Sequence, residues 1–184
     1  MDGKFTLKKA IRHFGTINKH KYEVLKACFM AGLYWRGIVH DLSKYSPIEF
    51  IAGVKYYQGG TSSPIDAEKS NLGYSLAWLH HRGRNPHHWE YWIDNLCHGG
   101  VPLKIPLKYI PESICDSIGA GKVYLGEKWT CKSTLEFFEK KLHHRKMHEE
   151  TTALQLAILR DFAERGFVAI RKDNIKRIAE KLAY

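Results

Sequence analysis

A histidine and an aspartate stand side by side in the stretch GIVHDLSK, residues 37–44, and a lysine follows the aspartate by three positions. Imidazole and carboxylate together suit Zn, Fe, Mn, Ni or Co, and a lysine beside them supplies a positive charge for an anionic group. One His-Asp pair carries little weight in a chain with eleven histidines, so its meaning depends on the residues that could join it. The three residues are His40, Asp41 and Lys44.

Further histidines and one aspartate could complete such a site. A lone buried histidine is usually a hydrogen-bonded core residue, and this is the alternative for each of them taken singly. Their order along the chain is more informative: a histidine on one helix, the His-Asp pair at the end of the next, more histidines downstream and an aspartate on a later helix. In that order the candidates are His20, His40 with Asp41, His81, His87 and His88, and Asp116.

This order resembles that of the HD superfamily of metal-dependent phosphohydrolases, whose members are all-helical and hold a metal ion with an H…HD…D set. The stretches YWRGIVHDLSKYSPIEF and HHRGRNPHHWEYW also look like those of an HD-like bacterial family of unknown function. The resemblance covers about residues 16–122, more than half of the chain. It implies an all-helical domain that binds one or two divalent ions, since some members of the superfamily are binuclear.

The resemblance also implies which residues bind the metal. The stretch HHRGRNPHH meets the family-like pattern H-x-x-x-N-x-H-H when it is counted from His81, so His80 is the less suitable member of that pair. By comparison with binuclear members, His81 and one or both of His87 and His88 would hold a second ion. The full ligand set that the resemblance implies is His20, His40, Asp41, His81, His87, His88 and Asp116.

Asp41 is expected to have the central role in this site. Neighbouring side chains on a helix point about 100° apart, so Asp41 cannot simply double the function of His40. Such a pair suits a site in which His40 binds one ion while Asp41 bridges two ions or reaches the second. We therefore expect Asp41 to be a catalytic residue as well as a metal ligand.

Three basic residues could bind a phosphate group. Lys44 follows Asp41 by three positions and His40 by four, so a helix would place it on the same face as both. In HDxxK members of the superfamily the lysine meets the substrate phosphate or the leaving oxygen, and the resemblance implies this role for Lys44. A surface lysine at a helix C-terminus is the alternative. Arg82 and Arg84 flank the histidine cluster and could pair with a phosphate, although exposed loop arginines would look the same.

Three functions fit these residues. The leading prediction is a metal-dependent phosphohydrolase that acts on a nucleotide or another small anionic phosphate ester. Ser43 stands where HD phosphodiesterases often carry glycine, and the GYP motif is absent, so a cyclic-dinucleotide substrate is not expected. The second function is a di-iron oxygenase, because some HD-fold proteins with a similar ligand pattern oxidise carbon with O₂. The third is a basic helical module that binds nucleic acid through the aromatic residues and arginines near residues 78–92.

The rest of the chain predicts an all-α fold of about seven to nine helices. Apolar residues recur at helical spacing, strand patterns are almost absent, and Gly32 is a suitable helix end. Ser46 and Pro47 open a helix, and Glu49 is expected to close its capping box, which makes Glu49 a cap rather than a catalytic residue. Helices are expected at about 16–31, 33–45, 46–59 and 64–81, from Asn85 with Pro86 at its first position, from about 111, from a capping box at 133–136 to Gly166, and after Asp173.

Length and composition limit the class of protein. We expect one domain, 1–184, with a metal-site core at about 16–122 and helices at 133–184 packed against it. The net charge of +10 attracts anions. No apolar run is long enough to cross a bilayer, so no membrane partner is expected.

The four cysteines lack C-x-x-C spacing and the N-terminal residues lack a secretory signal, which predicts free thiols in the cytoplasm. Surplus Trp and Tyr residues would suit a homodimer contact.

Overall fold

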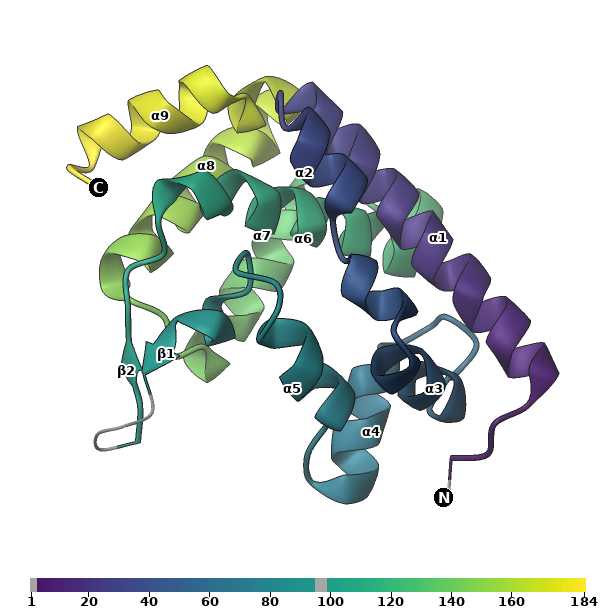
Figure 1. The fold of residues 1–184 in the computed structure, drawn as a ribbon. Coiled ribbons are helices and arrows are strands. Elements are labelled where there is room, and N and C mark those ends of the chain that lie inside the picture. Colours follow the sequence, from purple (N-terminus) through teal and green to yellow (C-terminus); the bar gives the residue numbers. More distant parts are fainter. Residues whose placement is uncertain (1–2, 95–98) are drawn as a thin grey trace.

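The computed structural model describes residues 3–94 and 99–184, and these residues form an almost entirely helical fold (Figure 1). Within the described ranges there are nine α-helices joined by short 3₁₀ turns and loops. The strands in this part of the chain form one antiparallel hairpin of β1 (Ile93–Asp94) and β2 (Val101–Pro102). The expected all-α class is therefore confirmed.

Two helices that cross at close range carry the first and the last of the expected ligands. They are α1 (Leu7–Met30) and α6 (Ile110–Leu125). Gly119 of α6 lies against Val24 of α1, and a Cβ atom added at Gly119 would lie 2.3 Å from Val24 Cγ2. The missing side chain at Gly119 therefore permits the close approach that brings the ligands on the two helices together.

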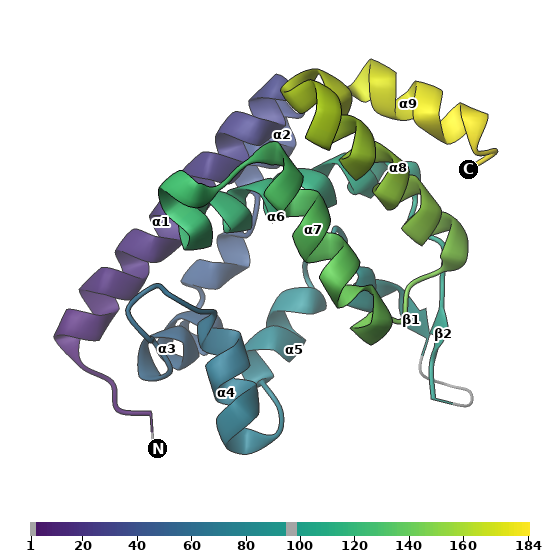
Figure 2. The same cartoon turned by 180° about the vertical axis from the view of Figure 1, so that it is seen from behind.

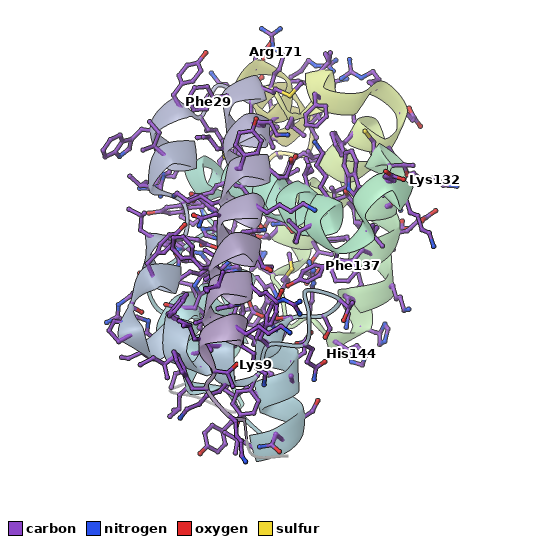
Figure 3. All side chains as sticks on the ribbon, turned by 90° about the vertical axis from the view of Figure 1, so that its right-hand side faces the viewer. Lys9, Phe29, Lys132, Phe137, His144 and Arg171 are labelled. Atoms are coloured by element: carbon purple, nitrogen blue, oxygen red, sulfur yellow. The ribbon has the colours of Figure 1, made fainter. Side chains whose placement is uncertain are left out.

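The first helix is longer than the sequence pattern predicted. It ends before Gly32 as expected, but it begins nine residues before position 16, with the Thr6 hydroxyl accepting a hydrogen bond from Lys9 N at 3.2 Å. The early part of the helix was missed because its buried face carries His13, where an apolar residue would have extended the pattern. Figure 3 views the molecule from the side of this helix, with Lys9 towards one end and Phe29 towards the other.

The predicted continuous helix over residues 33–45 is wrong, because the chain breaks at the His-Asp pair. The helix α2 covers Tyr34–Val39, and a 3₁₀ turn covers Leu42–Tyr45. Asp41 lies between them in the left-handed region of backbone conformation, at a φ of 53°. A non-glycine residue with positive φ is uncommon and is often found at a functional site.

A lysine of the first helix stabilises this break. Lys21 Nζ donates to the carbonyl oxygens of Ile38 and His40 at distances of 2.7 and 2.8 Å. These are carbonyl groups at the end of a helix, which would otherwise need a capping partner or water. The break matters for the site because His40 and Asp41 no longer have to point about 100° apart, as they would on a continuing helix.

The next helix begins as predicted. It is α3 (Pro47–Lys55), with Ser46 as its N-cap and the Ser46 hydroxyl accepting from Glu49 N at 3.5 Å. It ends a few residues before the glycines at 59 and 60 that were expected to end it. The helix carries Glu49. The backbone N–H of Glu49 is capped as expected, but its carboxylate contacts His81 instead of closing a capping box.

The fourth predicted helix is two helices. They are α4 (Pro64–Leu72) and α5 (Leu76–Arg82). Gly73, in the left-handed conformation at a φ of 80°, ends α4, and the hydroxyl of Ser75 accepts from Trp78 N at 2.9 Å to open α5. A glycine in positive φ and a serine N-cap are strong local stop and start signals that the long helical pattern concealed.

The α-helix expected from Asn85 is also wrong, since residues 86–88 form a turn and Trp89–Trp92 form one turn of 3₁₀ helix. The Asn85 side-chain amide donates to His81 O at 2.8 Å and to Ser43 Oγ at 3.0 Å instead of capping a helix. The side chain therefore holds the turn against α5 and the 3₁₀ turn after Asp41. This turn places His87 and His88 at the site.

Three further helices follow α6, namely α7 (Cys131–Lys141), α8 (Glu149–Arg165) and α9 (Lys172–Lys181). The capping box that opens α7 is formed by Thr130 and Ser133, so the helix starts two residues before the predicted box. The helix α8 ends at Gly166 as predicted. Figure 2 shows α7 and α8 in front of α6, on the side away from the viewer in Figure 1.

The C-terminal helices pack against the first and sixth helices. Buried apolar side chains of α1, α6, α7, α8 and α9 belong to one cluster. The metal-ligand candidates lie beside this core rather than within it. Representative members of the cluster are Val24, Cys28, Ile114, Phe138, Phe162 and Ile175.

None of the helices in the described ranges combines the length and the apolar character that a membrane-spanning segment requires. Three cysteines are free thiols: Cys28 and Cys115 are buried and Cys131 is partly buried. Cys97 lies outside the described residues.

Candidate metal centre

Five separate segments bring the expected ligands together. Helix α1 contributes His20, the break after α2 contributes His40 and Asp41, α5 and the following turn contribute three histidines, and α6 contributes Asp116. All seven residues fall into two groups whose ligand atoms lie within 4.8 Å of one another. We name them the His20 group (His20, His40, Asp41, Asp116) and the His81 group (Asp41, His81, His87, His88).

The His20 group is built around two carboxylates and two imidazoles. Asp116 Oδ1 lies 3.0 Å from His20 Nε2 and 3.3 Å from His40 Nε2. Asp41 Oδ2 lies 3.3 Å from His40 Nε2 and 3.9 Å from His20 Nε2. Ligand atoms that share one ion at about 2.0–2.2 Å lie roughly 3–3.6 Å apart when they are neighbours and up to about 4.2 Å apart when they are opposite, so this spacing suits a single ion.

Asp41 belongs to both groups because its two oxygen atoms face different histidines. While Oδ2 faces the His20 group, Oδ1 lies 3.5 Å from His81 Nε2 and 3.5 Å from His87 Nε2. The Nε2 atoms of His81 and His88 are 2.9 Å apart. A carboxylate with one oxygen in each of two imidazole groups has the arrangement of a bridging ligand.

Several of these ligand atoms are buried and make no hydrogen bond within the described chain. They include the Nε2 atoms of His20, His40 and His87 and the Oδ1 atom of Asp41, whereas Oδ2 of Asp41 forms an ion pair with Lys44. Buried polar atoms in native proteins are nearly always paired, because an unpaired one retains its full desolvation cost. Unpaired atoms that converge on two points fit cations at those points, so the buried His and Asp groups can hold metal ions.

Two further carboxylates contact the imidazole rings at the nitrogen that faces away from Asp41. Glu112 Oε1 lies 3.1 Å from His40 Nδ1 and 3.3 Å from His87 Nδ1. Glu49 Oε2 lies 2.8 Å from His81 Nδ1. Each contact leaves the Nε2 atom of the ring on the opposite side, directed towards Asp41. Carboxylates in this position fix the tautomer and the orientation of metal-binding histidines.

Sequence reasoning missed both of these carboxylates. Glu49 was expected to be a cap, but its side chain is buried and contacts His81 as well as His80 Nδ1, which is 2.6 Å from Glu49 Oε1. Glu112 is absent from the predicted site, although it precedes Asp116 by four residues on one helix and therefore lies on the same face. That spacing was the available signal. His80 belongs to neither ligand group.

The charges of the centre are strongly coupled. Burial would raise the pKa of Glu112, but hydrogen bonds from His40 and His87 lower it to about 2. Burial also opposes ionisation of Asp41, yet the positive charges of His40 and Lys44 hold its pKa well below the usual range. The pKa of His40 is raised well above its usual value, because attraction to Asp41 and other carboxylates outweighs burial. Without a metal ion, protons and the lysine supply the positive charge that the carboxylates require.

Lys44 lies beside the shared aspartate. Its Nζ atom is 2.6 Å from Asp41 Oδ2, at the i, i+3 spacing of a 3₁₀ turn rather than of the predicted helix. Burial lowers the pKa of Lys44, but the charges of Asp41 and Asp116 more than compensate and raise it. The side chain keeps 24% of its surface exposed and lines a cavity, so its ammonium group is available to an anion.

Arg82 and Arg84 do not contact this cavity. The Arg82 guanidinium donates to Glu90 O at 3.3 Å, and that of Arg84 donates to His80 O at 3.4 Å. Their role in phosphate binding stays a prediction.

A cavity of about 380 Å³ opens beside the centre. His20, His81, His88 and Asp116 reach it from the two ligand groups, together with Lys44. The remaining wall is mostly apolar. The arrangement therefore combines two adjacent candidate cation sites, a partly buried ammonium group and space for a small molecule.

Comparison with protein-family models gives a match over most of the chain. A family model described as a family of unknown function, DUF5662, matches residues 9–161, which include every residue of both ligand groups. No curated protein and no solved structure matches the chain.

Proposed function

The chain belongs to the DUF5662 family, and from its candidate metal centre we propose that it is a metal-dependent phosphohydrolase of the HD type, acting on a nucleotide or another small phosphate ester. The observation that carries the proposal is the position of Asp41. One of its oxygens faces each histidine group, and the ammonium of Lys44 lies against it at the edge of a cavity. The resemblance of the H…HD…D order to the HD superfamily supports the same function.

We propose that the centre holds two divalent transition-metal ions, drawn from Fe, Mn, Zn, Ni and Co. The His20 group would hold one ion and the His81 group the other, with Asp41 bridging them. When bound, such ions lower the pKa of a water ligand towards neutrality and polarise a phosphoryl oxygen. Glu49 and Glu112 keep the imidazole rings oriented, so that the ligand atoms are in place before substrate binds.

Lys44 has two tasks in this proposal. In the absence of substrate, its ammonium neutralises part of the negative charge of Asp41 at 2.6 Å. With a phosphate ester in the cavity, the ammonium is close enough to the centre to bind a phosphoryl oxygen and stabilise the charge that develops during hydrolysis. Because the side chain is largely buried, this charge is screened less than that of a surface lysine.

The net charge of the chain supports an anionic substrate. A balance of +10 raises the local concentration of anions around the molecule, and the effect falls with ionic strength. The proposed substrate is therefore small enough for the cavity and negatively charged at its reacting end.

Oxidation by a di-iron centre is the second candidate. It is favoured by the abundance of imidazole ligands around both oxygens of Asp41, since imidazole and carboxylate together also suit two iron ions. The ligand types do not separate the two chemistries. A nucleic-acid-binding module has less support, because Trp89 and Trp92 pack against the hydrophobic core instead of forming an open stacking surface.

Elemental analysis followed by activity assays tests the proposal. Protein purified without added metal is analysed for bound metal, then assayed for phosphate release from phenyl phosphate and nucleotides with each divalent ion, and for O₂ consumption. Phosphate release that requires bound metal supports hydrolysis. Two irons per chain with O₂ consumption and no phosphate release would replace hydrolysis by oxidation, and protein that binds no metal would end both proposals.

A further inference from the structure

The cavity beside the metal centre continues along one face of α1. His13, Thr16, Ile17 and His20 line it, at the spacing of successive turns on a single helix face. His20 is at the metal end, and His13 is seven residues earlier, which corresponds to roughly 10 Å along the helix axis. The cavity therefore has a second end, away from the reacting centre, marked by a histidine that is a member of neither ligand group.

The imidazole of His13 is held firmly but lacks a polar partner. Its ring lies 5.6 Å from the ring of Phe50 and 5.7 Å from that of Tyr57, measured between centroids. Gly53 makes room for it, since a Cβ atom at Gly53 would lie 2.1 Å from His13 Nε2. The residue is 7% exposed, and its Nδ1 atom is buried without a hydrogen bond to any residue that the structure describes. Such atoms are rare in native proteins, and water or another molecule from outside the chain is what commonly pairs them.

His13 is suited to an uncharged partner. Burial, and then the positive charge of Lys44, lower the pKa of His13 to about 4, so the ring is neutral at neutral pH. A neutral imidazole can accept or donate a hydrogen bond, but it offers no charge to a phosphate group. The end of the cavity at His13 therefore fits a hydroxyl, a carbonyl or a ring nitrogen of an organic molecule.

Other residues of the cavity favour a single phosphate group. Asp66, Glu68 and Glu90 line it in addition to the residues at the metal centre, and they outnumber the one other cation of its wall, Lys69, whose ammonium lies over the Trp78 ring. Further phosphate groups extending from the metal centre would meet these carboxylates, and like charges at short range are unfavourable. The volume of about 380 Å³ falls in the usual range of small-molecule sites, so an organic group can fit beside one phosphate.

We propose that the cavity binds a phosphate monoester whose organic part is uncharged and polar, and that His13 is the specificity-determining residue that hydrogen-bonds this part. The inference rests on the proposed function and adds its substrate class. The phosphate lies at Lys44 and the metal centre, and the organic part extends along α1 to His13. Monoesters are therefore preferred over the triphosphates of the same compounds.

The first experiment measures the selectivity of the wild-type protein loaded with metal. The substrates are phenyl phosphate, hexose 6-phosphates, nucleoside 5′-monophosphates and the corresponding triphosphates. We expect kcat/KM for the best polar monoester to exceed those for phenyl phosphate and for the triphosphates by about tenfold or more. Phenyl phosphate is the reference because its organic part has no polar atom for His13 to bind.

The second experiment uses His13→Phe, which keeps a flat ring, and His13→Gln, which keeps a hydrogen-bonding group. We expect His13→Phe to raise KM for the best polar monoester about tenfold, with kcat and bound metal unchanged and with hydrolysis of phenyl phosphate changed less than about twofold. His13→Gln should recover part of the loss. An equal loss on both substrates would mean a structural role and would overturn the inference.

The outcomes separate the inference from the function on which it rests. Metal-dependent hydrolysis of phenyl phosphate without a preference for polar monoesters, or with a preference for triphosphates, would leave the proposed function standing and refute the role of His13. Absence of hydrolysis of every phosphate ester by metal-loaded protein would refute both. If His13→Phe does not fold, the selectivity of the wild-type protein tests the substrate class and His13→Gln tests the role of His13.

Discussion

Glu112 holds His40 through the Nδ1 atom at 3.1 Å, so that the opposite nitrogen of the ring faces Asp41. The same Glu112 oxygen lies 3.3 Å from His87 Nδ1. One carboxylate therefore orients one histidine from each ligand group. Arg36 lies behind it, with NH1 3.4 Å from Glu112 Oε2.

Replacement of Glu112 by glutamine should weaken metal binding without removing a ligand. The amide keeps the shape of the side chain but carries no charge, so the imidazoles lose basicity and orientation. We expect metal affinity to fall about 10–100-fold, measured by titration of metal-free protein with a competing chelator. Glu136→Gln on the exposed face of α7 is the matched control and should leave the affinity unchanged. Equal affinity in both variants would contradict the orienting role of Glu112.

Asp41 and Asp116 should differ in the number of ions that depend on them. Asp41→Asn removes a charge shared by both groups, whereas Asp116→Asn affects only the His20 group. We expect Asp41→Asn to lose all bound metal and hydrolysis, and Asp116→Asn to keep one ion per chain, as measured by elemental analysis. Asparagine is preferred to alanine at position 41 because it tolerates the left-handed conformation better. An active Asp41→Asn protein would refute the bridging arrangement.

The convergence of the seven residues named by the resemblance agrees with their order along the chain, and their role as metal ligands stays a prediction. His20 and Asp116 are far apart in the chain, and the periodic helices on which they lie were recognised. The backbone at Asp41 could not be predicted in the same way. Its break is stabilised by Lys21, which binds Ile38 O and His40 O from another helix, and no local pattern encodes that contact.

The orienting carboxylates escaped prediction for a related reason. Glu49 satisfies the capping pattern through its backbone N–H, and this local explanation concealed the contact of its side chain with His81, 32 residues away. The contact of Glu112 with His40 spans 72 residues. Both contacts depend on how helices pack, whereas sequence periodicity reports only which face of a helix is buried.

Lys44 should affect hydrolysis without affecting metal content. Lys44→Met removes the ammonium beside Asp41, while the ligand atoms stay in place. We expect kcat for phosphate-ester hydrolysis to fall by about 10²–10³, with bound metal unchanged by elemental analysis. Lys69→Met is the control within the same cavity, since the Lys69 ammonium lies over the Trp78 ring at 5.1 Å, and kcat should change less than about threefold. Parallel loss of metal and activity in Lys44→Met would assign the lysine a structural role.

His13 should make the stability of the protein depend on pH. Its pKa is about 4 in the folded protein and 6.5 in the unfolded chain. Stability is therefore complete above pH 6.5, where the ring is neutral in both states, and is lost as the pH falls towards 4, because the unfolded chain binds the proton more tightly. The full difference corresponds to roughly 3 kcal/mol, an upper bound. We expect the free energy of unfolding, measured with urea at fixed metal content, to fall less steeply in His13→Phe between pH 6.5 and pH 4. Parallel curves for the two proteins would contradict burial of a neutral imidazole.

The crossing of α1 and α6 should control the His20 group through its packing. Gly119→Ala would place a Cβ atom 2.3 Å from Val24 Cγ2 and 3.1 Å from Val24 N, so the helices must move apart. We expect a loss of about 1–3 kcal/mol of stability in thermal unfolding and weaker binding of one ion, because His20 and Asp116 separate. Gly15→Ala in α1 is the matched control: it has no atom within 4 Å and should gain about 0.5–1 kcal/mol from helix propensity. If Gly119→Ala bound both ions as tightly as Gly15→Ala, the crossing would not set the geometry of the centre.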